Sequence, residues 1–494
     1  MPSVSPERIS FNPQTLHQTV SFDSVKMVHL TTLPLEILHA ICANLCRHCT
    51  SEPVEPVEPG ERVEQYELCF KGAEAFAMDK TKIKTAALSA MMLTCKTLRD
   101  IAQPYLYHYP YARAPAVSKL LLRSLVERPD LAHYINQLSM FDMQCQTLEG
   151  HLQILLRVPE YRDRSKEEIT QSHTRKCHCY HNPLIRGKRV KFVKIKYDFV
   201  TAFTSLILPF GTGLQILHLE LDEDRKFPFC KPGSFPRLKE LVVKTWRGSE
   251  PADITVIASI FIAAPALERL GGLRICLAEW EGPRPPIHEG VKEIWLERCE
   301  VSPEGVIALL GLFPRLEALT YESDRDRSTL SLSRISDALL VCQDLRFLSL
   351  DFTNYYTGGE VHPRDQPGGG LAELKKLQKL RIKGLSLFSE EEWPRTGLPI
   401  KISDLLPASI TELEVTHPGR IIFDDMLELS GVASQRFPLL KHVSIDGIEQ
   451  EWEVYDWRRQ ACMGLERINK LRQAFGQSGI ELSTGDFGKF VGFC

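Results

Sequence analysis

The sequence lacks most features of a secreted, membrane-bound or nucleic-acid-binding protein. Its longest apolar run, residues 254–267, contains Thr255, Ser259 and Pro265 and is too short to cross a bilayer. Residues 1–32 contain no apolar segment of the signal-peptide kind. A formal net charge of −3 over 494 residues attracts neither nucleic acid nor an acidic membrane. We therefore expect a soluble, unsecreted protein without a nucleic-acid or membrane partner.

The fourteen cysteines show no regular disulfide spacing. Cys42, Cys46 and Cys95 lie on predicted helix faces, where intracellular proteins bury reduced thiols. This distribution predicts a location in the cytoplasm or the nucleus.

The sequence also lacks the motifs typical of nucleotide-binding and serine-nucleophile enzymes. The glycines at 368–370 precede a predicted helix but lack the Lys-Ser/Thr of a phosphate-binding loop, and no Gly-x-Ser-x-Gly occurs. We therefore predict no enzyme activity, no catalytic residue and no cofactor.

One short segment carries zinc-type ligands, namely Cys177, His178, Cys179 and His181. Its spacing is tighter than that of known structural zinc sites and no second pair follows, so a polar surface loop is the favoured interpretation and we predict no metal site. A zinc- or thiol-dependent enzyme centred here is the alternative. The nearby basic run 186–191 is interpreted as a solvated surface, with a nuclear signal or phosphate contact as alternatives.

Two segments near the N-terminus have helical apolar spacing. The first follows Pro34, which suits the first turn of a helix, and its apolar positions are Leu35, Leu38, Ile41, Cys42 and Leu45. The second is residues 87–102, and the segment 104–107 is expected to end it. Residues 47–83 between them include a Pro/Glu repeat that favours a solvated spacer, with a short helix possible at 62–80. Residues 1–28 are expected to be a disordered leader.

Together, Leu-Pro-x-Glu-Ile-Leu at 33–38 and Leu-x-Cys-Lys-x-Leu-Arg at 93–99 and its flanks resemble the F-box. This helical motif docks onto the Skp-type adaptor of a Skp–cullin–F-box ubiquitin ligase. The resemblance implies a three-helix F-box over residues 29–110, with the insertion at 47–83. It also implies that these residues face the adaptor or support the helices that do: Leu33, Pro34, Leu35, Ile37, Leu38, Leu93, Cys95, Lys96 and Leu98.

The rest of the chain repeats a pattern with apolar residues at positions one, four and six. It begins at residues 135, 214, 238, 291, 316, 345, 377, 410 and 440, with a degenerate copy at 267. Helical segments at 118–128, 253–263, 302–313, 331–342 and 424–435 alternate with these predicted strands, and Pro236, Pro265, Pro314 and Pro438 precede four of them. Such alternation resembles leucine-rich repeats, of the irregular kind found in fungal-type F-box proteins.

The predicted fold is therefore an α/β solenoid. A three-helix F-box is followed by an irregular leucine-rich-repeat horseshoe over residues 111–494, with a parallel sheet on its concave face. A basic His/Cys insertion near 160–192 interrupts the repeats.

The resemblance implies a substrate-recognition subunit that binds the adaptor and cullin through the F-box and an unknown target through the repeats. The alternative is an interaction scaffold that acts without ubiquitin transfer. Because side chains alternate across a strand, we predict an outward-facing target site with two exposed aromatic rings, formed by Glu293, Trp295, Glu297, Thr320, Phe347, Ser349 and Asp351. A loop covering both rings is the competing expectation. The basic row Lys379, Arg381 and Lys383 is expected to pair with its acidic neighbours Glu412 and Glu414.

Overall fold

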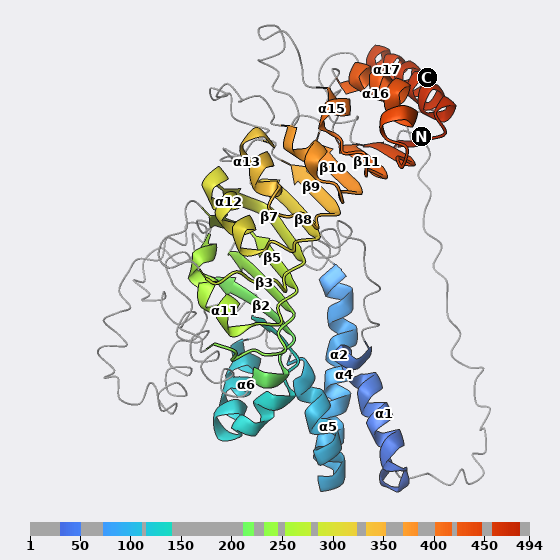
Figure 1. Cartoon of the computed structure of the whole chain (residues 1–494). Coiled ribbons are helices and arrows are strands. Elements are labelled where there is room, and N and C mark those ends of the chain that lie inside the picture. Colours follow the sequence, from blue (N-terminus) through green and yellow to red (C-terminus); the bar gives the residue numbers. More distant parts are fainter. Residues whose placement is uncertain are drawn as a thin grey trace, which may run out of the picture.

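The computed structural model describes residues 30–50, 73–110, 115–140, 211–221, 232–245, 252–277, 285–323, 332–351, 369–383, 401–416, 422–446 and 457–484. The leader at 1–28 and the whole of the insertion near 160–192, with its zinc-type segment, lie outside these residues. The structure is an α/β fold built on an open parallel sheet with helices (Figure 1).

The helices and strands follow the order expected for a repeating chain. The helices are η1 (Leu30–Thr32), α1 (Leu35–Leu45), α2 (Arg47–Thr50), α4 (Ala73–Thr94), α5 (Lys96–His108), α6 (Pro115–Glu127), η2 (Pro129–Tyr134), η4 (Gly211–Gly213), η5 (Ile254–Ile257), α11 (Ala258–Ala263), α12 (Pro303–Leu312), α13 (Leu332–Leu339), η6 (Gly369–Glu373), α15 (Ile402–Leu405), α16 (Ile422–Arg436) and α17 (Trp457–Gln477). The strands are β1 (Gln137–Met140), β2 (Ile216–Leu221), β3 (Glu240–Thr245), β4 (Ala252–Asp253), β5 (Arg269–Leu273), β6 (Ile275–Leu277), β7 (Glu293–Val301), β8 (Ala318–Ser323), β9 (Phe347–Asp351), β10 (Lys379–Lys383), β11 (Glu412–Thr416), β12 (His442–Asp446) and β13 (Glu481–Thr484).

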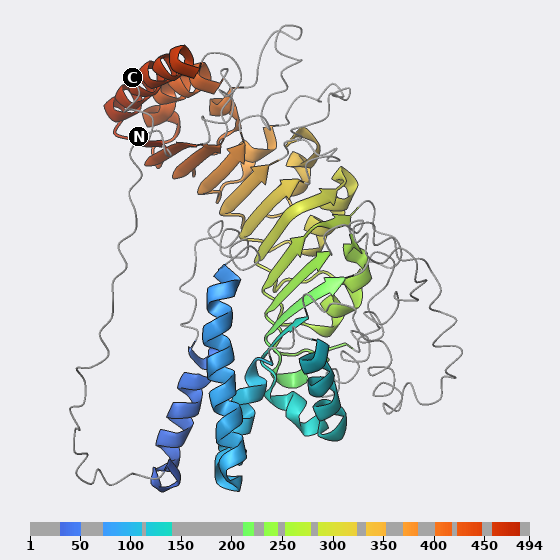
Figure 2. The ribbon, with the colours of Figure 1, turned by 180° about the vertical axis from the view of Figure 1, so that it is seen from behind.

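The sheet keeps the order of the chain. Its path is β1-β2-β3-β5-β7-β8-β9-β10-β11-β12-β13, and every neighbouring pair is parallel. The short strands β4 and β6 pair with each other, and β6 also pairs with β7. Helices α11, α12 and α13 lie along one side of the sheet, whereas α4 lies on the other side (Figures 1 and 2).

The register aligns the repeated pattern from strand to strand. Leu241 lies beside Leu217 and Leu270, and the same row continues through Ile294, Leu319, Leu348, Leu380, Leu413 and Val443 to Leu482. The side chains of this row, Leu482 excepted, are buried in the main hydrophobic core, together with the position-one residues from Leu214 to Leu440. The predicted copies from residue 214 to residue 445 are therefore confirmed as strands with their apolar residues inside, and the first copy forms β1 with Ile135 and Leu138 in the same core.

The predicted helix cap at Ser302 and the predicted turns at the four prolines are also confirmed. The Ser302 hydroxyl accepts a hydrogen bond from Gly305 N–H at 2.9 Å and caps α12, with Pro303 in its first turn. Pro236, Pro265, Pro314 and Pro438 each lie in the turn before a strand. Strand β13 was not anticipated, because its sixth position is Thr484 rather than an apolar residue.

The N-terminal helices have a small core of their own. It consists of Leu38, Cys42, Leu88, Met91, Leu98, Ile101 and Ala102, from α1, α4 and α5. Further along α5, Tyr107 packs against the main core instead. Helix α5 therefore contacts both cores and connects the two parts of the molecule.

Two details of the predicted N-terminal unit are wrong. The segment 87–102 is not one helix, because Cys95 is extended and its Sγ accepts a hydrogen bond from Leu98 N–H, which starts a new helix. Pro104 does not end that helix, which continues to His108. Within the predicted insertion at 47–83, α2 begins at Arg47 and α4 begins at Ala73.

Candidate functional site

The predicted adaptor-facing residues divide into three groups by burial. Leu38 and Leu98 are each only 2% exposed and hold the three helices together. Leu33 and Cys95 are half-buried and pack against the same core. The remaining five are exposed and are Pro34, Leu35, Ile37, Leu93 and Lys96.

The exposed apolar residues cluster at one end of the N-terminal unit. Leu35 and Ile37 lie in the first turn of α1, and Leu93 lies in the last turn of α4. Figures 1 and 2 show that α1 begins at the same end of the unit where α4 ends and α5 begins. Leu93 is 84% exposed, and contact of so much apolar surface with water is unfavourable in free energy. This end of the unit therefore offers an apolar surface, here called the helix-end surface, made of Leu35, Ile37 and Leu93.

The predicted target row lies on the face of the sheet opposite the main core, as alternation requires, but its two aromatic rings are not exposed. Trp295 is 5% and Phe347 is 4% exposed, which corrects the prediction of exposed anchors. A Cβ atom at Gly271 would lie 2.3 Å from Cε2 and Cζ2 of Trp295, so the indole ring covers strand β5. Glu297 and Ser349 are buried as well, whereas Glu293, Thr320 and Asp351 are partly exposed.

Cross-strand ion pairs occupy much of the same face. Lys379 pairs with Glu412 at 3.0 Å and Arg381 pairs with Glu414 at 3.2 Å, as expected. Lys383 instead pairs with Asp351 at 3.1 Å. On the first strands, the buried Glu240 accepts a hydrogen bond from Nε of Arg269 at 2.9 Å. Part of the charge on this face is therefore satisfied internally.

A serine, a histidine and a glutamate also lie close together on β12 and β13. Ser483 Oγ is 3.0 Å from Nε2 of His442, and Nδ1 of His442 is 3.7 Å from the Glu481 carboxylate. The Glu481 side chain is 80% exposed, so water screens its charge and it does not fix the imidazole. We interpret this group as ordinary cross-strand pairing rather than as an activated nucleophile.

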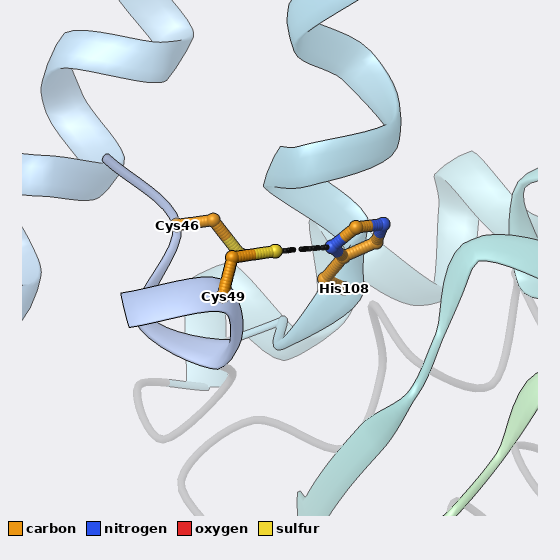
Figure 3. Close-up of side chains that lie close together, drawn as sticks. All are labelled: Cys46, Cys49 and His108. Carbon is orange, nitrogen blue, oxygen red and sulfur yellow. Dashed lines mark hydrogen bonds between the residues drawn. The ribbon is translucent and has the colours of Figure 1, made fainter. Parts of the chain in front are cut away.

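A different group of side chains has the composition of a metal site. Cys46, Cys49 and His108 place their ligand atoms within 4.8 Å of one another. Figure 3 shows the thiol of Cys49 directed at the imidazole ring of His108. Partial burial of the thiol and the neighbouring Cys46 raise the pKa of Cys49 to about 12. Cysteine spacing could have indicated this group, because Cys46 and Cys49 form a Cys-x-x-Cys pair.

The alternative zinc-type segment at 177–181 and the basic run at 186–191 lie outside the described residues, so their interpretations stay predictions. None of the described helices has both the length and the apolar character needed to cross a membrane. No family model matches the chain, and a search of curated proteins finds no match either.

Proposed function

We propose that this chain is the substrate-recognition subunit of a Skp–cullin–F-box type ubiquitin ligase. The N-terminal helices act as the F-box that docks the Skp-type adaptor, and the sheet region binds the target protein. The observation that carries this proposal is the helix-end surface, where exposed apolar residues lie on a helical unit with its own core. Exposed apolar clusters of this kind indicate an interaction site.

The sheet region supports the second half of the proposal. Parallel strands in chain order, with helices along one side, are what a leucine-rich-repeat solenoid requires. Each repeat buries its leucines against its neighbours, so the partly exposed side chains of the opposite face are the ones that bind a partner. Glu293, Thr320 and Asp351 remain the proposed target contacts, because they are the partly exposed members of the predicted row.

In this role the chain performs no chemistry. It holds a target beside a ubiquitin-charged enzyme, and the tether turns ubiquitin transfer into a proximity-driven step. Such a complex would operate in the cytoplasm or the nucleus. A scaffold that binds the adaptor without recruiting a cullin is the alternative function.

A double substitution in the helix-end surface tests the docking step. Leu35→Ser with Leu93→Ser removes two exposed side chains from two different helices. Because each buried leucine is worth roughly 1.5 to 3 kcal/mol, the pair should weaken adaptor binding by at least about 100-fold. Isothermal titration of the purified full chain with a Skp-type adaptor measures the change.

The matched control is Leu120→Ser with Leu439→Ser. These leucines are 60% and 51% exposed and lie in α6 and after α16, away from the helix-end surface. The control should bind the adaptor as tightly as the unchanged chain. Equal binding by both double variants would show that the adaptor does not use this surface. Adaptor binding without recovery of a cullin from cell extracts would favour the scaffold function.

A further inference from the structure

We propose that Cys46, Cys49 and His108 bind one zinc ion. Cys46 follows α1, Cys49 lies in α2, and His108 is the last residue of α5. More than fifty residues separate the cysteines from the histidine in the chain. Their convergence is therefore a property of the fold and not of local sequence.

The distances between the ligand atoms suit a tetrahedral zinc site. Zinc lies about 2.3 Å from a cysteine sulfur and about 2.0 Å from a histidine nitrogen, so tetrahedral angles place S and N about 3.5 Å apart. Nδ1 of His108 lies 3.7 Å from Sγ of Cys46 and 3.4 Å from Sγ of Cys49. Zinc can therefore enter between the three atoms without a large movement of the backbone.

The donor set selects the metal. Two thiols and one imidazole are soft and borderline ligands, which favour zinc over magnesium or calcium. The Cys-x-x-Cys pair has a spacing that is common in structural zinc sites. Three protein ligands leave a fourth tetrahedral position, which a solvent molecule fills.

The surroundings hold the histidine in place. The Tyr105 ring lies 5.2 Å from the His108 ring, and the Tyr105 hydroxyl group lies 3.1 Å from Nδ1 of His39. His108 also accepts a hydrogen bond from the backbone N–H of Asn136 through its carbonyl oxygen, at 3.1 Å. Asn136 directly precedes the first strand. A zinc ion here would therefore join α2 to the point where α5 meets the sheet region.

Two simpler states compete with a metal. The thiols can hydrogen-bond to the imidazole, or Cys46 and Cys49 can be oxidised to a disulfide. Reducing conditions cleave the disulfide, and hydrogen bonds alone account for no bound zinc that depends on Cys49 and His108. Zinc binding by the reduced chain therefore separates a zinc site from both states.

The test measures zinc in the full chain, purified under reducing conditions and dialysed against excess zinc chloride. The unchanged protein should retain one more equivalent of zinc than Cys49→Ser or His108→Asn. The affinity of each variant for zinc at this site should be at least about 100-fold weaker than that of the unchanged protein. Cobalt(II) in place of zinc should give a thiolate-to-cobalt absorption band that both variants lose. Circular dichroism checks that the variants are folded.

The control is a double variant, Cys177→Ser with Cys179→Ser, which removes the other cysteine pair that could bind zinc. It should keep the equivalent of zinc and the cobalt band. The proposal is overturned if Cys49→Ser and His108→Asn bind as much zinc as the unchanged chain. It is equally overturned if the reduced, unchanged chain binds no zinc that these variants lose.

Discussion

At the scale of single residues, the packing of Trp295 depends on the absence of a side chain at Gly271. The indole ring lies against strand β5, where a Cβ atom would approach its carbons to 2.3 Å. Gly271→Ala should therefore displace the ring and destabilise the protein by roughly 1 to 3 kcal/mol, measured by chemical unfolding.

The matched control for this substitution is Gly311→Ala. A Cβ atom there has no described neighbour within 4 Å, and the residue lies in α12. Because alanine has a higher helix propensity than glycine, the substitution should stabilise the protein by about 0.5 to 1 kcal/mol. In a Trp295→Ala background, Gly271→Ala should lower the free energy of unfolding much less, because the indole ring that the new Cβ atom would meet is gone. An equal cost in both backgrounds would mean that Trp295 is not what constrains Gly271.

Asp425 in α16 gives a pH-dependent prediction. Burial and the nearby Glu428 raise the pKa of its carboxyl group to about 6, although Lys401 opposes the shift. Its Oδ2 atom is buried and has no hydrogen-bond partner among the described residues. Because the folded pKa lies above the unfolded value of about 3.9, the folded state binds the proton more tightly, and stability falls as pH rises through the range from about 4 to 6.

Asp425→Asn removes this charge. It should therefore raise the free energy of urea unfolding at pH 7.5 by roughly 1 kcal/mol, after allowing for solvent screening, and should change it little at pH 4.5. The neighbouring exposed Asp424→Asn is the control and should have no such effect. The same gain at both pH values would contradict the assignment.

At the scale of elements, α4 redefines the interruption of the N-terminal unit. Lys84 of α4 donates a hydrogen bond from its Nζ to the Thr50 hydroxyl group at 3.1 Å, and Leu88 and Met91 lie in the small core. The part that can be replaced is therefore residues 51–72 and not the whole of 47–83.

A ten-residue Gly/Ser linker in place of residues 51–72 should preserve adaptor affinity. Ala73 lies about 16 Å along the helix from Lys84, and such a linker spans about 17 Å on average. The same linker in place of 51–83 removes three turns of α4 and should lower the thermal stability of the helical unit. Binding titrations and thermal unfolding measure the two effects. Loss of adaptor binding in the shorter replacement would place residues 51–72 in the interface.

At the scale of the whole molecule, two separate cores predict two separate unfolding units. Leu98→Ala removes a buried side chain from the N-terminal core, whereas Leu348→Ala removes one from the main core. Each change should cost roughly 2 to 5 kcal/mol. Hydrogen exchange with mass spectrometry should show faster exchange in α1, α4 and α5 for Leu98→Ala, and in β8 to β10 for Leu348→Ala. Faster exchange across the entire described chain in both variants would mean that the two cores unfold together.

The sequence by itself determined the strands that carry the repeated pattern, and their inward faces. Leucines at positions one, four and six give each segment a single way to bury its apolar side, so local pattern and tertiary packing agree from Leu214 to Ile445. The helix cap at Ser302 was predictable for the same reason, because a hydroxyl before Pro303 satisfies a backbone donor nearby in the chain.

Only the tertiary structure decided what lies on the opposite face and where the two parts of the chain meet. Alternation placed Trp295 and Phe347 on that face, but their burial depends on neighbours far away in sequence, such as Gly271. The break at Cys95 depends on one side-chain hydrogen bond that competes with helix continuation. The meeting of Cys46 and Cys49 with His108 requires α1, α2 and α5 to pack together, because no local pattern links residues so far apart in the chain.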